Sequence, residues 1–150
     1  MEFISGSAKQ TQKLGKIILA KIKKATTVPA KVGTVVCLWG ELGSGKTTLT
    51  QALARELGVK ARVISPTFVL MKNYQLKTRD YKLLVHIDAY RLEHEDELLK
   101  LGWQEIISDP KNLIFIEWPE KVKKIIPRKR FDVHLKHLGK NKRKIKVVKH

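Results

Sequence analysis

The chain has 150 residues, of which 43% are hydrophobic, and a net charge of +17 at pH 7. This length and composition predict one globular domain over residues 1–150 with a core of its own. No apolar run approaches the roughly 18 residues of a membrane-spanning helix, the first residues lack a secretory signal, and the single cysteine rules out a disulfide framework. We therefore expect a cytoplasmic protein with no membrane segment.

Positive charge is concentrated in the last part of the sequence. Residues 121–150 contain 13 Lys or Arg and one acid, Asp132, whereas the first 120 residues carry a balance of only +5. Clustered positive charge favours a polyanionic partner, for which nucleic acid is the usual candidate; a lysine-rich solvated surface is the alternative. Phe131 is the only aromatic residue of the segment, so the segment offers no platform on which bases would stack.

The N-terminal part of the chain predicts a helix and then a strand. Residues 7–10, Ser-Ala-Lys-Gln, have the pattern of a capping box, which opens a helix. The apolar side of that helix is formed by Leu14, Ile17, Ile18 and Ile22. Residues 34–39 are a continuous apolar run, as is typical of a parallel strand buried on both faces.

A glycine-rich segment follows this strand directly. Residues 40–47 match the phosphate-binding pattern G-x-x-x-x-G-K-S/T without a gap. Glycines let backbone N–H groups turn towards an anion, and the next helix, which ends at Gly58, presents its positive end. The lysine supplies a charge for the β- and γ-phosphates, and the threonine hydroxyl can join the shell of Mg²⁺. This predicts a nucleoside triphosphate site formed by Gly40, Leu42, Gly43, Ser44, Gly45, Lys46 and Thr47.

Strands and helices alternate through the rest of the chain. Pro66 makes residues 59–68 a loop or the edge of a strand. The pattern then predicts a strand over 68–76, a buried strand over 83–88, a short acidic helix over 93–101, a buried strand over 113–117, and a short helical piece that starts at 118–120 and ends at Pro127. Alternation around Gly139 predicts a basic β-hairpin within 128–150. We expect an α/β fold of the P-loop NTPase type: three layers, a mostly parallel sheet with helices on both faces, and the C-terminal hairpin.

Two of the predicted strands end in a carboxylate, Asp88 and Glu117. Ligands of such sheets bind at the carboxyl ends of the strands, so either residue could hold Mg²⁺ or position an attacking water; the alternative is that each caps the next helix. Thr67 could reach the γ-phosphate side of the metal. Arg91 could stabilise charge on the phosphoryl group or pair with Glu95.

Trp118 and His86 each have two interpretations. Trp118 could stack on a base or fill the core, and the core is the commoner place for a tryptophan. His86 lies inside a strand, where a structural role is the more usual one.

Four motifs together resemble the TsaE (YjeE) family. They are Gly-Glu-Leu-Gly-Ser-Gly-Lys-Thr-Thr at 40–48, Ser-Pro-Thr-Phe at 65–68, His-Ile-Asp-Ala-Tyr-Arg-Leu at 86–92 and Ile-Glu-Trp-Pro-Glu at 116–120. The resemblance covers roughly residues 7–127 and implies a bacterial ATPase required for N6-threonylcarbamoyladenosine at position 37 of tRNA. It also implies partners, the TsaB–TsaD pair, in which TsaD performs the transfer and TsaE uses ATP to sustain turnover.

The resemblance also assigns roles to residues. It implies that Gly43 to Thr48 hold the phosphates, that Thr47 and Glu117 bind Mg²⁺, that Asp88 is a catalytic or metal-adjacent carboxylate, and that Thr67 senses the γ-phosphate. It implies that the start of the first helix and the hairpin turn lie near the base. Ala8, Thr11 and Asn141 are therefore expected to contact the nucleotide. The hairpin from Phe131 onward matches no motif of the family.

Three functions are compatible with these features. The first is a Mg²⁺-dependent ATP-hydrolysing protein of tRNA modification that works with TsaB–TsaD. The second is a small-molecule kinase on the same fold, although the segment between Asp88 and Glu117 is acidic and shows no arginine-rich lid. The third is an ATP-dependent switch that binds RNA, such as tRNA, through the 121–150 face.

Overall fold

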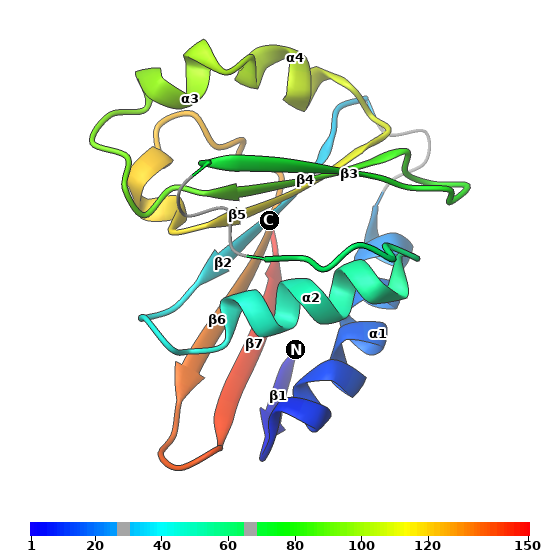
Figure 1. The fold of residues 1–150 in the computed structure, drawn as a ribbon, viewed down its shortest axis with the longest axis vertical. Coiled ribbons are helices and arrows are strands. Elements are labelled where there is room, and N and C mark those ends of the chain that lie inside the picture. The colour runs from blue at the N-terminus through cyan, green and yellow to red at the C-terminus, as the bar shows by residue number, and fades with distance from the viewer. Residues whose placement is uncertain (27–30, 65–68) are drawn as a thin grey trace.

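The computed structural model describes residues 1–26, 31–64 and 69–150, and its centre is one seven-stranded sheet. The strands lie in the order β1-β7-β6-β2-β5-β4-β3 (Figure 1). Their bounds are β1 Glu2–Ser5, β2 Thr34–Trp39, β3 Met71–Gln75, β4 Leu83–Asp88, β5 Asn112–Glu117, β6 Phe131–His137 and β7 Arg143–Lys149. The helices are α1 Ala8–Ala25, α2 Lys46–Glu56, α3 Asp96–Lys100, α4 Trp103–Ser108 and the 3₁₀ turn η1 Pro119–Val122.

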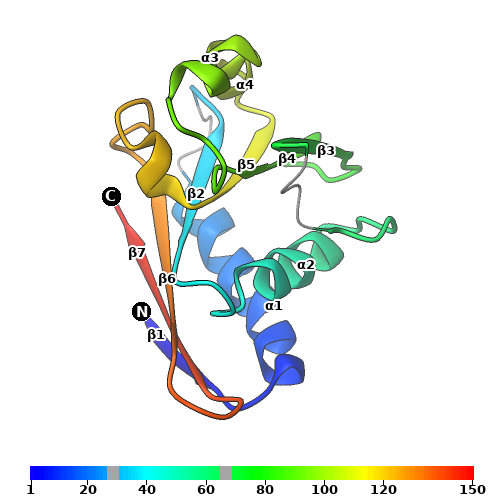
Figure 2. The same cartoon turned by 60° about the vertical axis from the view of Figure 1, so that its left-hand side comes forward.

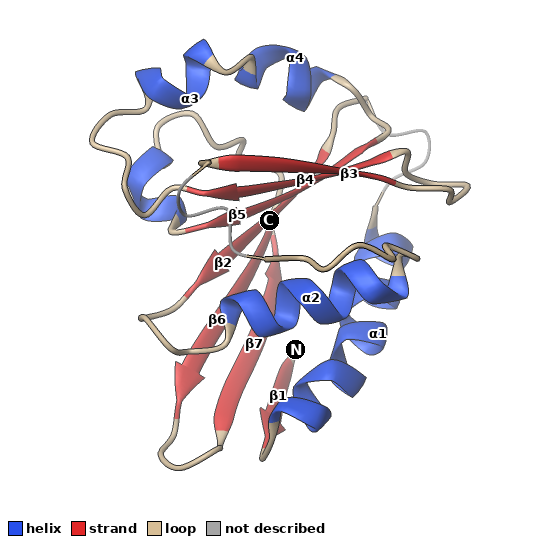
Figure 3. Cartoon of the chain, in the orientation of Figure 1, coloured by secondary structure: helices blue, strands red, loops and turns tan. Residues whose placement is uncertain are grey.

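The sheet is mixed, with a parallel centre. β6, β2, β5 and β4 pair in parallel, while β3, β7 and β1 are added antiparallel at the two sides (Figure 3). The predicted parallel centre and the predicted C-terminal hairpin, β6 with β7, are both present. The sheet is more mixed than predicted, because β1 pairs antiparallel with β7 at one edge and β3 pairs antiparallel with β4 at the other.

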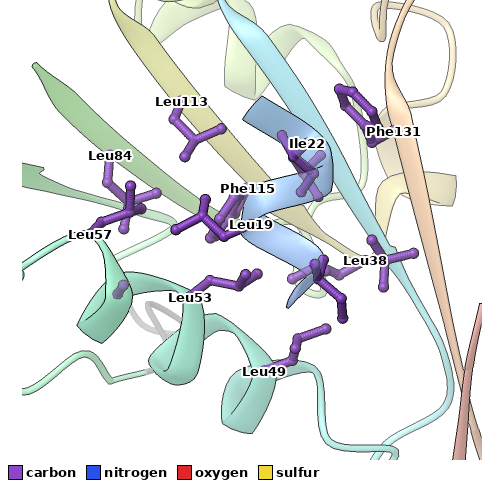
Figure 4. Packing of buried hydrophobic residues seen from close by; sticks show 14 of the residues in the cluster. Leu19, Ile22, Leu38, Leu49, Leu53, Leu57, Leu84, Leu113, Phe115 and Phe131 are labelled. Atoms are coloured by element: carbon purple, nitrogen blue, oxygen red, sulfur yellow. The ribbon is translucent and has the colours of Figure 1, made fainter. Parts of the chain in front are cut away.

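Alternating side chains of the central strands form two cores, one on each face of the sheet. On β2, Val36 and Leu38 belong to the core under α1 and α2, whereas Val35 and Cys37 belong to the core under α3, α4 and η1. Figure 4 shows Leu49 and Leu53 of α2 packed with side chains of α1 and the sheet in the first of these cores. Burial on both faces explains why the central strands have unbroken apolar sequences.

Helix α1 begins as its sequence predicts. The Ser7 side chain accepts a hydrogen bond from the Gln10 backbone N–H at 3.1 Å, and Gln10 Oε1 accepts from the Gly6 N–H. Ile18 and Ile22 are fully buried, but Ile17, which we also assigned to the apolar side, is 45% exposed. Its position one residue before Ile18 turns it by about 100° away from the sheet, since a helix has about 3.6 residues per turn.

Several element boundaries differ from the prediction. The strand predicted over 68–76 is β3, Met71–Gln75, and the acidic helix predicted over 93–101 is the single turn of α3, Asp96–Lys100. β1 and α4 were not predicted from the sequence. Both are short, and their stability comes from packing and pairing with distant segments, which a local pattern does not report. Within the described ranges no helix is long and apolar enough to cross a membrane.

A buried carboxylate on β6 joins the two ends of the hairpin, since its partners precede β6 and follow β7. Asp132 is 4% exposed, accepts from Arg130 Nε at 2.9 Å and from Nη2 at 3.1 Å, and lies 2.8 Å from His150 Nε2. Burial opposes its ionisation, but the hydrogen bonds from Arg130 and the charges of Arg130 and His150 outweigh burial and lower the pKa of Asp132. Asp132, the one acidic residue of segment 121–150, thus has a structural role in the hairpin.

We predict that Asp132→Asn lowers the free energy of unfolding at pH 7 by about 2 kcal/mol, because two charge-assisted hydrogen bonds are lost. The folded-state pKa lies below the ordinary value of 3.8, so this stabilisation is present above about pH 5 and is lost as the pH falls through the folded-state pKa. Urea unfolding at pH 7 and pH 3 measures it. The gap between the two proteins should shrink at pH 3, and a constant gap would contradict the assignment. Asp80→Asn is the matched control, since Asp80 is half-exposed where it pairs with Lys23 at 3.5 Å.

Candidate functional site

The glycine-rich loop joins the end of β2 to the start of α2, at the carboxyl edge of the parallel strands. Gly45 is the residue before α2 and has φ +99°, a left-handed conformation that glycine adopts readily. Gly40 has φ +151°, and a Cβ on it would lie 2.5 Å from the Leu135 carbonyl oxygen and from Ser44 Oγ. The loop geometry therefore requires glycine at both positions.

The side chain of Lys46, the first residue of α2, folds back onto the glycine-rich loop. It is 5% exposed, and its Nζ donates to the carbonyl oxygens of Gly40 at 2.5 Å and Glu41 at 3.0 Å. The same Nζ lies 4.2 Å from the centre of the Trp118 ring, a cation–π arrangement. Burial lowers the pKa of Lys46, although the nearby carboxylates, Glu117 foremost, favour its charged form. The result is a partly desolvated cation beside an open cavity.

The two predicted carboxylates lie next to each other. Asp88 and Glu117 are paired positions of β4 and β5, and their residues are 5% and 3% exposed. Glu117 Oε1 accepts from the Thr47 hydroxyl at 3.4 Å and lies 2.9 Å from His86 Nε2. Asp88 Oδ1 accepts from the Tyr90 backbone N–H at 3.0 Å. The sheet register thus brings both acids to the first turn of α2.

These groups line one cavity of about 410 Å³. Its walls are the loop, the first turn of α2, the ends of β4 and β5, and the start of β7. The lining residues are Leu42, Gly43, Gly45, Lys46, Thr47, Thr48, Asp88, Tyr90, Glu117, Trp118 and Arg143. The structure therefore assembles most of the predicted site from four segments far apart in sequence.

Other predicted residues lie elsewhere. Gly40 and Ser44 line a neighbouring cavity of about 360 Å³, and Thr67 lies outside the described residues. Thr11 is buried at the start of α1, 2.8 Å from the Ser5 hydroxyl, while Ala8 and Asn141 are exposed. None of Ala8, Thr11 and Asn141 lines the 410 Å³ cavity, and their contact with a nucleotide stays a prediction.

Trp118 lies between the cavity and the second core, and its stacking on a base stays a prediction. It lines the cavity, and its ring centre lies 4.9 Å from that of Tyr90. It also packs against the second core. The residue has φ +57°, which is uncommon for a side chain of this size.

The sequence did not identify three residues at or beside the cavity as parts of the site. Tyr90 was not singled out, and His86 supports Glu117 directly. Arg143 comes from β7, whereas the sequence pointed to Arg91 as the arginine near the site; Arg91 is exposed and does not line the cavity. Only the pairing of β7 beside β6 brings Arg143 here, and no local pattern reports that pairing. His86 could have been found, because it shares a strand face with Asp88.

Fold and site together define the class of the protein. It is an α/β protein in which a glycine-rich loop, followed by a lysine, faces two carboxylates at the ends of neighbouring strands. The model of the family "Threonylcarbamoyl adenosine biosynthesis protein TsaE" matches residues 5–145. The chain belongs to the TsaE family of tRNA threonylcarbamoyladenosine biosynthesis.

Individual relatives and a solved structure agree with this. The TsaE protein of Bacillus subtilis (strain 168) is 38% identical over 125 residues, which are 83% of this chain and 75% of that protein. The TsaE protein of Treponema pallidum (strain Nichols) is 31% identical over 99% of this chain and all of its own length. The crystal structure of Bacillus subtilis YdiB has a TM-score of 0.72 and 26% identity, over 97% of this chain and 82% of that one.

We predict that His86 supports Glu117 through its hydrogen bond. His86→Leu leaves the buried Glu117 carboxylate without this donor and should lower the free energy of unfolding by about 1–3 kcal/mol, whereas His86→Gln retains a donor and should cost less. Denaturant unfolding of both variants measures this. His94→Leu is the control, because that side chain is 72% exposed. Equal losses for His86→Gln and His86→Leu would contradict the role of the hydrogen bond.

Proposed function

We propose that the protein binds and hydrolyses ATP with Mg²⁺, in support of the threonylcarbamoyladenosine modification of tRNA, and acts with the TsaB–TsaD complex. The observation that carries the proposal is the shared cavity of Lys46, Thr47, Asp88 and Glu117. Membership of the TsaE family supports a role in threonylcarbamoyladenosine biosynthesis. The expected partnership with TsaB–TsaD rests on the family resemblance.

The phosphates would lie on the loop. Backbone N–H groups of Gly43, Gly45 and Lys46 and the N-terminal end of α2 attract anions. The Lys46 ammonium is buried and therefore poorly hydrated. It would bind the β- and γ-phosphates. A triphosphate would replace carbonyl oxygens as the main partner of Lys46 Nζ.

The side chains also fit Mg²⁺. Thr47 Oγ1 and Glu117 Oε1 are hard oxygen donors 3.4 Å apart at the cavity wall. No group of three or more His, Cys, Asp or Glu residues that could form a metal cage exists in the described part of the chain. Mg²⁺ does not need one, since it commonly takes one or two protein ligands, phosphate oxygens and waters. When bound, the ion would neutralise charge that develops on the phosphates.

Hydrolysis would follow from the remaining groups. Asp88 is fixed by the Tyr90 N–H and by its buried position beside Glu117, which suits a carboxylate that positions the attacking water. Lys46 would stabilise charge on the leaving oxygens. Thr67 would sense the γ-phosphate, as the family resemblance implies.

The central test is ATP hydrolysis with and without TsaB–TsaD. We expect slow hydrolysis by the protein alone, a strong change in rate on addition of TsaB–TsaD, and a loss of about a hundredfold or more in Lys46→Ala and Glu117→Gln. Lys60→Ala, an exposed lysine outside the cavity, is the control and should match the wild type. Release of free phosphate is measured in each case.

Two results would contradict this proposal. The first is a hydrolysis rate that TsaB–TsaD leaves unchanged. The second is the appearance of the phosphate on an added nucleoside or sugar, which would make the protein a kinase.

Contact with tRNA belongs to the same proposal and is supported by one uncovered face of the sheet. The second core contains no described residue of β1, β6 or β7, and Figure 2 shows no helix over the outer side of these strands. His134, Lys136 and Lys146 are exposed there, because they alternate with buried residues. Trp39 stacks on His134 with ring centres 5.8 Å apart, so this face has an aromatic pair that segment 121–150 alone did not reveal.

We predict that replacing Lys136 and Lys146 by alanine weakens tRNA binding and reduces the slope of log affinity against log salt by up to about 2, close to 1 for each lost phosphate contact. The matched control replaces Lys9 and Lys16, which are exposed on α1 at the opposite face. Fluorescence anisotropy with a tRNA transcript at several salt concentrations measures this. Equal effects of the two double substitutions would show that only net charge matters.

A further inference from the structure

The start of β7 brings an arginine against the glycine-rich loop. A Cβ built on Gly45 would lie 3.2, 3.3 and 3.4 Å from Nε, Cδ and Cζ of Arg143. Arg143 also lines the 410 Å³ cavity together with Lys46 and Thr47. Its guanidinium therefore lies beside the residue from which α2 begins.

Arg143 has an unsatisfied hydrogen-bond donor. Its Nε is buried and makes no hydrogen bond to any described residue, and its side chain forms no ion pair with one. Burying an N–H donor such as this Nε without an acceptor is costly. The cavity contains Asp88 and Glu117, yet these acids are occupied with Tyr90, Thr47 and His86. The missing acceptor is therefore expected to come from a ligand.

The chemistry of the side chain indicates which ligand. Guanidinium presents several N–H donors in a planar fork that matches two oxygens of one phosphate. Lys46 in the same cavity is a point charge and does not provide this geometry. An anion with several oxygens next to Gly45 would satisfy both cations.

We propose that Arg143 is a phosphate-binding residue of the nucleotide site, which donates from its guanidinium to the polyphosphate from the C-terminal hairpin. This inference rests on the proposed nucleotide function and adds a residue that lies outside the glycine-rich loop and outside the four motifs. It makes the hairpin part of the nucleotide site through β7 itself.

The test uses Arg143→Ala and Arg143→Lys in the full chain. We expect the affinity for Mg-ATP and for inorganic tripolyphosphate to fall about tenfold to a hundredfold in Arg143→Ala, with a smaller loss in Arg143→Lys because that variant keeps the charge but not the fork. Displacement of a fluorescent ADP analogue measures both ligands. Lys124→Ala is the control; it removes the same charge from an exposed position that lies outside the hairpin and does not line the cavity, and it should change both affinities by less than about twofold.

Each other outcome would overturn the inference. Unchanged affinities in Arg143→Ala, or losses equal to those in Lys124→Ala, would exclude a direct phosphate contact. A loss for ATP but not for tripolyphosphate would assign the contact to the nucleoside. Thermal unfolding without ligand shows whether the variants are folded. If the wild type itself binds neither ligand, the proposed function fails; if it binds both and Arg143→Ala does too, only this inference fails.

Discussion

The pairing of β5 with β2 on one side and β4 on the other determines where the groups of the site lie. Glu117 is opposite Leu38 of β2 and Asp88 of β4, so the carboxyl ends of three parallel strands meet at one edge. The loop that leaves β2 starts at this edge and returns as α2. A shift of one residue in the register would turn the Glu117 side chain to the other core, away from Thr47. The two apolar cores prevent such a shift, because every strand residue would exchange its environment.

The same packing keeps several charged groups poorly hydrated at this edge. Lys46, Asp88 and Glu117 are each at most 5% exposed, and burial of charge lowers stability unless partners compensate. The compensation is incomplete, since the pKa of Lys46 is lowered despite three nearby carboxylates and Arg143 Nε has no partner among the described residues. Under the proposed function, a charged ligand would complete this compensation. Incompletely compensated charges of this kind are typical of functional sites.

The parts of the fold that were predictable from sequence are those fixed by local physics. The bounds of β2 and β4 followed from apolar runs that need burial on both faces, and the start of α1 followed from the Ser7 cap. The glycine-rich loop followed from its pattern, and the two carboxylates from their position at strand ends. β1 and the position of Arg143 did not follow, because both depend on antiparallel pairing with segments far away in the chain. Pairing partners of short strands leave no periodic signal.

Basic residues that are clustered in the sequence lie on different faces of the structure, because side chains alternate between the two faces of a strand. Residues 121–150 look like one basic surface, but the structure divides them. Arg130 is used to hold Asp132, and Lys149 Nζ donates to the Ala25 carbonyl at the end of α1. Arg143 faces the loop, whereas Lys146, three residues later, lies on the uncovered side, since successive side chains of a strand point to opposite faces. The proposed nucleotide and tRNA contacts therefore lie back to back on β7, and substitutions of neighbouring residues can separate them even though the charge cluster is continuous in sequence.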